Sequence, residues 1–225
     1  MSAAATVPAG SRAGTRAAAG AMRCAAGWLA GAGLALFTLF TLFTLFALLA
    51  LLAPAAHAAE PVPLAELAKP GRVLMLRHAN APGVGDPPAF RLEDCSTQRN
   101  LDAAGRAQAA TLGERLAKAG VARAKVYSSQ WCRCLETARL LKLGPPAELP
   151  ALNSFYGRAQ DRDANLAALR TFLAGLPVDG PPVVLVTHQF TIDAFTGQGT
   201  VSGGGTIFEL NGSGAPRALG PIPAN

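Results

Sequence analysis

Two short apolar segments, each leading to a histidine, restrict most strongly what this chain can fold into. Residues 73–76 (VLML) lead to Arg77 and His78, and residues 183–186 (VVLV) lead, after one threonine, to His188. A continuous apolar run of about four residues, bounded by turn residues, is typical of a strand buried on both faces of a parallel sheet. Because ligands of open α/β sheets bind outside the carboxyl ends of the strands, the sequence predicts a site beside these histidines.

The remaining apolar patterns predict helices alternating with strands. Between Asp102 and Gly120 the apolar residues recur at the spacing of a helix. Asp102 is expected to cap the start of this helix, and Gly120 to end it. The other predicted elements are a strand at 125–127, helices at 130–142 and 163–175, a short helix ending near 195 and an edge strand at 206–210. This order predicts an α/β fold, a three-layer α/β/α sandwich with a mostly parallel central sheet.

The first 58 residues have the composition of an export signal. Residues 1–27 contain three arginines and no acid, residues 28–53 contain no charge, and an Ala-x-Ala site predicts cleavage before Ala59. The apolar part is long enough to span a bilayer, so an uncleaved anchor is the alternative. In both cases the arginine-rich end stays in the cytoplasm. We therefore expect a periplasmic or secreted domain, or one anchored to the membrane and facing the periplasm.

Residues 59–225 form the expected folded domain, long enough for one hydrophobic core. All 14 acidic residues and 17 of the 20 Lys and Arg residues lie in this part, which leaves it with a net charge of +3. This mild basicity suits a small anionic substrate. No run of Lys and Arg indicates nucleic-acid binding, and membrane contact is expected only through an uncleaved N-terminal segment.

Three cysteines remain in this domain. In an exported protein one disulfide is expected, joining Cys95 to either Cys132 or Cys134. The Cys-x-Cys pair lacks the residue spacing typical of zinc ligands, so no metal site is expected.

The polar residues at the strand ends favour phosphate chemistry. If the predicted strands are parallel neighbours, they bring together Arg77, His78, Arg133 and His188. Guanidinium groups match the geometry of phosphate oxygens. A neutral His78 can attack phosphorus and form a phosphohistidine, while the arginines and a protonated His188 balance the developing charge. Further candidates are Arg99 and Asn100 for the phosphate, and Trp131, Phe155 and Tyr156 for the entrance of the site.

Four motifs, taken in order, resemble one known family. They are LRHA at 76–79, GRAQAATLGERL at 105–116, SSQWCRCLETA at 128–138 and VTH at 186–188. Over most of residues 72–210 the chain resembles the histidine phosphatase (phosphoglycerate mutase-like) superfamily. The export signal makes it similar to the periplasmic branch that includes the lipopolysaccharide core heptose phosphatase.

This resemblance implies the roles of the site residues. His78 would be the phosphorylated nucleophile, Arg77, Arg133 and His188 would form the phosphate pocket, and neither a metal nor an organic cofactor would be needed. Active phosphomonoesterases of the superfamily usually supply a carboxylate that protonates the leaving oxygen. Here the loop PALNSFYG contains no acid, and Gln189 follows the second histidine. The remaining candidates for this proton donor are Asp86, Asp94 and Asp193.

The expected function is therefore that of an exported phosphohydrolase of the histidine acid phosphatase type. It would act as a phosphomonoesterase, or as a phosphoramidate hydrolase whose leaving group needs less protonation. Its partner would be a small phosphorylated substrate or a phosphorylated envelope component. The alternative is a non-catalytic anion-binding envelope protein on the same fold.

Overall fold

The computed structural model describes residues 41, 43 and 60–223 of the chain. The chain divides into two units, Met1–His57 and Ala58–Asn225, and the fold below is that of the second. Apart from residues 41 and 43, the predicted export segment and its cleavage point lie outside the described residues. Within the described part of the chain, no helix has the length and apolar character that a membrane crossing requires.

A six-stranded mixed sheet forms the centre of the domain, in the order β3-β2-β4-β1-β5-β6. The first four strands in this order are parallel, whereas β5 runs antiparallel to β1 and β6 antiparallel to β5. The strands are β1 (Arg72–Arg77), β2 (Lys125–Ser128), β3 (Pro146–Glu148), β4 (Val183–Thr187), β5 (Gly205–Glu209) and β6 (Arg217–Pro221). The predicted α/β fold with a mostly parallel sheet is confirmed.

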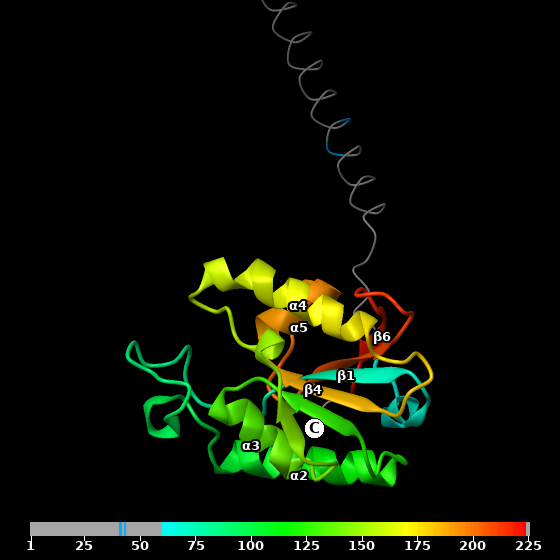
Figure 1. The fold of residues 1–225 in the computed structure, drawn as a ribbon, viewed down its shortest axis with the longest axis horizontal. Coiled ribbons are helices and arrows are strands. Elements are labelled where there is room, and N and C mark those ends of the chain that lie inside the picture. Colours follow the sequence, from blue (N-terminus) through cyan, green and yellow to red (C-terminus); the bar gives the residue numbers. More distant parts are fainter. Residues whose placement is uncertain (1–40, 42, 44–59, 224–225) are drawn as a thin grey trace, which may run out of the picture. The chain divides into compact units, whose positions relative to one another are not determined.

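Helices cover both faces of this sheet (Figure 1). Helices α2 (Ala103–Lys118) and α3 (Cys132–Leu140) lie on one face, and α4 (Arg162–Ala174) and α5 (Gln189–Thr196) on the other. Short 3-10 helices complete the described elements: η1 (Leu64–Ala68), η2 (Cys95–Thr97), η3 (Pro150–Leu152) and η4 (Ala159–Asp161). The three predicted layers are present.

The alternation of side chains along β1 explains why this strand reads as continuously apolar. Leu74 and Leu76 belong to the core beneath α2 and α3, whereas Val73 and Met75 belong to the core beneath α4 and α5. All four side chains are fully buried. Since successive side chains point to opposite faces, a strand covered by helices on both sides needs apolar residues at every position.

Three strands differ from the sequence-based expectation. The strand predicted at the sheet edge, β5, is internal, because β6 pairs with its outer side. Neither β6 nor β3 was expected, since their sequences RALGP and PAE contain proline and have little strand propensity. Backbone pairing with a neighbour, rather than a local pattern, orders these two strands.

The register between β1 and β4 places the functional residues. Arg77 is paired with Thr187, so His78 and His188 leave the sheet from adjacent strands at the same level. The backbone N–H of His78 continues the ladder by donating to the carbonyl of Thr187 at 3.0 Å.

Candidate active site

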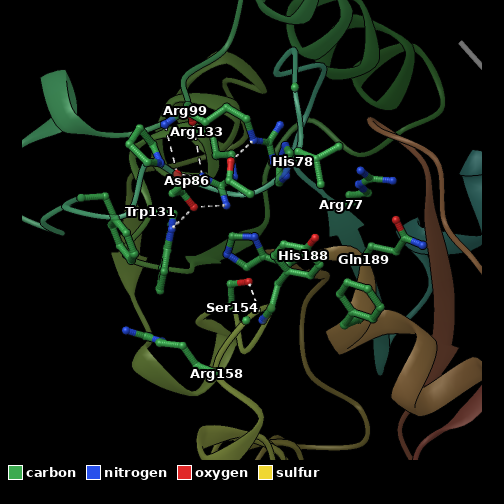
Figure 2. Close-up of a pocket in the computed structure, with 18 of the residues that line it drawn as sticks. Arg77, His78, Asp86, Arg99, Trp131, Arg133, Ser154, Arg158, His188 and Gln189 are labelled. Carbon is green, nitrogen blue, oxygen red and sulfur yellow. Dashed lines mark hydrogen bonds and ion pairs between the residues drawn. The ribbon is translucent and has the colours of Figure 1, made fainter.

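The structure brings the four predicted phosphate-pocket residues to one cavity of about 500 Å³ (Figure 2). Arg77 and His78 come from the end of β1, His188 from the end of β4, and Arg133 from the first turn of α3, which follows β2. The centroids of the two imidazole rings lie 5.6 Å apart. These residues converge because their strands are neighbours with parallel direction.

His78 has the protonation state that a nucleophile needs. Its Nδ1 lies 2.8 Å from the carbonyl oxygen of Ala79. Because a carbonyl oxygen only accepts, Nδ1 carries the proton, and the lone pair is on Nε2. Burial, followed by the charge of Arg133, lowers the pKa of His78 to about 3. The ring is therefore neutral at physiological pH.

His188 is buried beside the first histidine and is neutral as well. Its Nε2 lies 2.9 Å from Oγ of Ser129 and 3.5 Å from Sγ of Cys134. Burial, then the charge of Arg133, lowers the pKa of His188 well below its ordinary value. The expected protonated His188 is thus not the form that these surroundings favour. The positive charge of the site comes from the arginines instead.

Four arginines line the cavity, Arg77, Arg99, Arg133 and Arg158, together with a single carboxylate, Asp86, among the described lining residues. Nη1 of Arg77 donates to the carbonyl of Thr200 at 2.6 Å. The Nε atoms of Arg77 and Arg133 are buried and have no hydrogen-bond partner among the described residues. The site therefore has excess positive charge and unused donors, which suit a phosphate-like anion.

Asp86 serves as the partner of Arg133, which corrects the expectation that it is a proton donor. Its Oδ1 lies 2.8 Å from Nη1 of Arg133 and its Oδ2 3.1 Å from Nη2. The carboxylate also accepts from Nε1 of Trp131 and from the backbone N–H of Arg99, each at 3.0 Å. Burial opposes ionisation, but the hydrogen bonds and charge of Arg133 outweigh it and lower the pKa of Asp86. A carboxylate held in this way accepts hydrogen bonds and has no proton to donate.

The other two candidate donors do not line the cavity. Asp94 caps η2 by accepting from the backbone N–H of Ser96 at 3.1 Å, and it pairs with Arg91. Asp193 lies on α5, where burial raises its pKa and its Oδ1 has no hydrogen-bond partner among the described residues.

Of the two additional phosphate candidates, only Arg99 lines the cavity. Its Nε donates to the carbonyl of Gly85 at 2.8 Å. The side-chain amide of Asn100 instead donates to the carbonyl of Cys95 at 2.6 Å, outside the cavity. Asn100 therefore stabilises its own loop.

The cysteines form one disulfide, between Cys95 and Cys132, which ties η2 to the start of α3. Cys134 is free and buried, and burial raises the pKa of its thiol to about 12, so it stays protonated and is a poor nucleophile. Within the described residues, no group of three or more His, Cys, Asp or Glu side chains could hold a metal ion.

The cavity is more aromatic than the sequence indicated. Trp131 and Tyr156 line it as expected, whereas Phe155 is buried and does not. Phe90, Arg158 and Phe190 also line the cavity and were missed. Phe190 lies two residues after His188. The sequence alone does not indicate that it lines the cavity, because this depends on the path of the loop before α4.

The geometry defines a class of protein: a mixed α/β domain with a neutral histidine and several arginines around an anion site at the strand ends. Residues 73–170 match the model of the histidine phosphatase superfamily (branch 1). This match confirms the resemblance to the superfamily that the motifs indicate.

Several solved structures are similar to the chain at low identity. A proposed phosphohistidine phosphatase, SixA, from Agrobacterium tumefaciens is 21% identical with a TM-score of 0.47, and the match covers 69% of this chain and 99% of that one. The mycobacterial glucosyl-3-phosphoglycerate phosphatase Rv2419c with inorganic phosphate is 19% identical with a TM-score of 0.47, over 65% and 93%. The Rv3214 protein of Mycobacterium tuberculosis is 15% identical with a TM-score of 0.49, over 65% and 94%. No curated protein matches the chain.

Proposed function

We propose that this domain is a phosphohydrolase that transfers a phosphoryl group from its substrate to Nε2 of His78 and then to water. The match of residues 73–170 to the histidine phosphatase superfamily supports phosphohydrolase activity in general. The observation that carries the particular mechanism is the hydrogen bond from Nδ1 of His78 to the carbonyl of Ala79. It leaves the lone pair of a neutral imidazole on Nε2, in a cavity that arginines line.

The reaction has two steps. In the first, Nε2 of His78 attacks phosphorus, the phosphorus–oxygen bond breaks, and the leaving oxygen departs with the electron pair. Arg77, Arg99 and Arg133 stabilise the charge on the other phosphate oxygens. In the second step, water attacks the phosphohistidine, the phosphorus–nitrogen bond breaks, and inorganic phosphate leaves while the imidazole regains its lone pair.

The substrate would be a small phosphorylated molecule or a phosphorylated envelope component outside the cytoplasm. Two features support an exported site of action. The N-terminal residues have the order of a basic, an apolar and a small-residue region. The disulfide between Cys95 and Cys132 is typical of proteins in oxidising compartments.

Rapid-quench kinetics of the full chain with para-nitrophenyl phosphate test this mechanism. We expect a burst of nitrophenol and an acid-labile phosphoenzyme, both of which His78→Asn removes together with at least about 10³-fold of kcat. Arg106→Ala is the matched control, since Arg106 lies on the surface of α2 and pairs with Glu136. A His78→Asn variant that turns over at the wild-type rate would overturn the assignment of the nucleophile.

One observation favours the alternative, a non-catalytic anion-binding protein. The single carboxylate among the described lining residues is tied to Arg133 as an ionised partner, so it does not provide the usual acid. Para-nitrophenol leaves without protonation, so turnover of its phosphate ester is expected even without that acid. Absence of turnover, together with unchanged phosphate binding by His78→Asn, would favour the binding protein.

A further inference from the structure

Two exposed aromatic rings stand together at the entrance of the cavity. Tyr156, from the loop after η3, and Phe190, from the first turn of α5, stack with ring centroids 5.5 Å apart and an interplanar angle of 12°. Both line the cavity, yet Tyr156 is 50% and Phe190 43% exposed. Exposed aromatic surface that is gathered at a cavity marks a place where an apolar group binds.

A second aromatic group lies in the same lining. Phe90 and Trp131 are in contact, with ring centroids 5.6 Å apart. The guanidinium of Arg158 lies 5.4 Å from the centroid of Trp131 and 6.0 Å from that of Phe90. Beside the phosphate site, the cavity is thus lined by the flat, apolar faces of aromatic rings.

The chemistry of the leaving group adds an independent constraint. Among the described lining residues Asp86 is the single carboxylate, and Arg133 keeps it ionised. Without a protonated carboxyl group among these lining residues, the leaving oxygen departs as an anion. A phenolate can do so, because the pKa of a phenol is about 10. An aliphatic alkoxide is far more basic and leaves much more slowly.

We propose that the substrates of this site are aryl phosphate monoesters, whose ring packs against the pair formed by Tyr156 and Phe190 while the phosphate lies at His78. This proposal rests on the proposed function for its chemical step. Aromatic rings at centroid distances of 4.5–7 Å attract one another beyond the burial of their area. In the step itself the phosphorus–oxygen bond breaks, and water protonates the released phenolate.

Binding of two non-hydrolysable ligands tests the recognition separately from catalysis. We expect the full chain to bind phenylphosphonate about tenfold more tightly than methylphosphonate in a calorimetric titration. The double variant Tyr156→Leu/Phe190→Leu should lose this preference and keep its affinity for methylphosphonate. Val178→Ala, which removes another exposed apolar side chain away from the cavity, should behave like wild type. Equal affinities in wild type, or a preference that the double variant keeps, would overturn the proposal.

Turnover of two esters with leaving oxygens of similar basicity tests the chemistry. Phenyl phosphate and hexafluoroisopropyl phosphate qualify, since only the first carries an aromatic ring. We expect kcat/KM to favour phenyl phosphate about tenfold in wild type and to be about equal in the double variant. Turnover of both esters without preference would overturn the aryl substrate and leave the phosphohydrolase intact. Preferential binding of phenylphosphonate without any turnover would instead refute the proposed function and keep the aromatic subsite.

Discussion

At the scale of single residues, burial decides the state of the site. Both histidines of the cavity are buried next to arginines, so both remain neutral where an exposed histidine would begin to charge. This arrangement keeps the lone pair of His78 available over a wide range of pH. The lowered pKa values also make the free energy of unfolding depend on pH.

The first prediction concerns the stability of the folded chain in mild acid. The pKa of a histidine in the unfolded chain is about 6.5, whereas burial lowers the pKa of His78 to about 3. Between these values the unfolded state binds more protons, so the free energy of unfolding falls as the pH falls below 6.5. We expect a loss of about 2 kcal/mol from His78 between pH 7 and pH 5. Urea denaturation at both pH values measures it.

His78→Asn is the control for this measurement. The variant should lose less stability than wild type over the same pH interval, because the group that takes up the proton is gone. His188→Asn should also lose less stability than wild type, since the pKa of His188 is lowered in the same direction. Equal losses in wild type and both variants would show that other groups govern the acid sensitivity.

The second prediction concerns the buried ion pair of Asp86 with Arg133. Their side chains are 9% and 3% exposed, so Asp86→Ala leaves a buried guanidinium without its counter-charge. We expect a loss of about 3 kcal/mol in the free energy of unfolding near neutral pH. Asp94→Ala, which breaks an ion pair with an exposed arginine and removes the cap of η2, should cost less.

The pH dependence of this ion pair has a definite sign. The pKa of Asp86 is lowered in the folded state, so its contribution is complete above the unfolded pKa of about 3.9 and is lost as the pH falls below it. The difference between wild type and Asp86→Ala should therefore shrink in this acid range. A constant difference from pH 6 to pH 3 would contradict the ionised pair.

At the scale of helices and strands, local sequence patterns were sufficient to predict the long helices that pack one face against the sheet. The predicted cap of α2 is present, with the carboxylate of Asp102 accepting from the backbone N–H of Gly105 at 2.6 Å. The helix predicted at 163–175 differs from α4 by one residue at each end. Strands β3 and β6 could not be predicted, because pairing with a distant neighbour, not their composition, orders them.

The third prediction concerns the close approach of α2 to the end of α3. A Cβ on Gly113 would lie 2.3 Å from the carbonyl oxygen of Leu141, a backbone atom that cannot move alone. Although alanine favours helix, we expect Gly113→Ala to lower the free energy of unfolding by about 1–3 kcal/mol.

Gly175→Ala, at the end of α4, is the matched control. A Cβ there would make contacts of 3.5 Å or longer, so the substitution should be neutral or mildly stabilising. Thermal unfolding of the two variants measures both effects. Equal behaviour would show that α2 and α3 can separate without cost.

At the scale of the whole molecule, the sequence predicted the part of the site that strand order determines. Arg77, His78 and His188 lie at the ends of apolar strands, and Arg133 follows a third. The role of Asp86 and the pairing of Tyr156 with Phe190 could not be predicted. They depend on how long loops fold over the sheet, and a loop of glycine and proline residues has no periodic pattern that fixes its path.

The fourth prediction concerns the disulfide that fastens one of these loops. Cys95 and Cys132 are 37 residues apart, and closing such a loop restricts the unfolded chain. We expect the double variant Cys95→Ser/Cys132→Ser to lose about 2–4 kcal/mol in the free energy of unfolding. A reductant should lower the melting temperature of wild type toward that of the variant and leave the variant unchanged. If the reductant also lowers the melting temperature of the variant, the reductant acts on something other than this disulfide.

The register between β1 and β4 has a consequence for how the molecule fails on heating. The backbone amide of His78 is part of the central ladder, since it donates to Thr187, and its hydrogen should exchange with solvent only when the whole domain unfolds. Tyr156 lies on a loop, so its segment is expected to open at lower cost. As the temperature rises, discrimination between substrates should decline before the nucleophile is displaced.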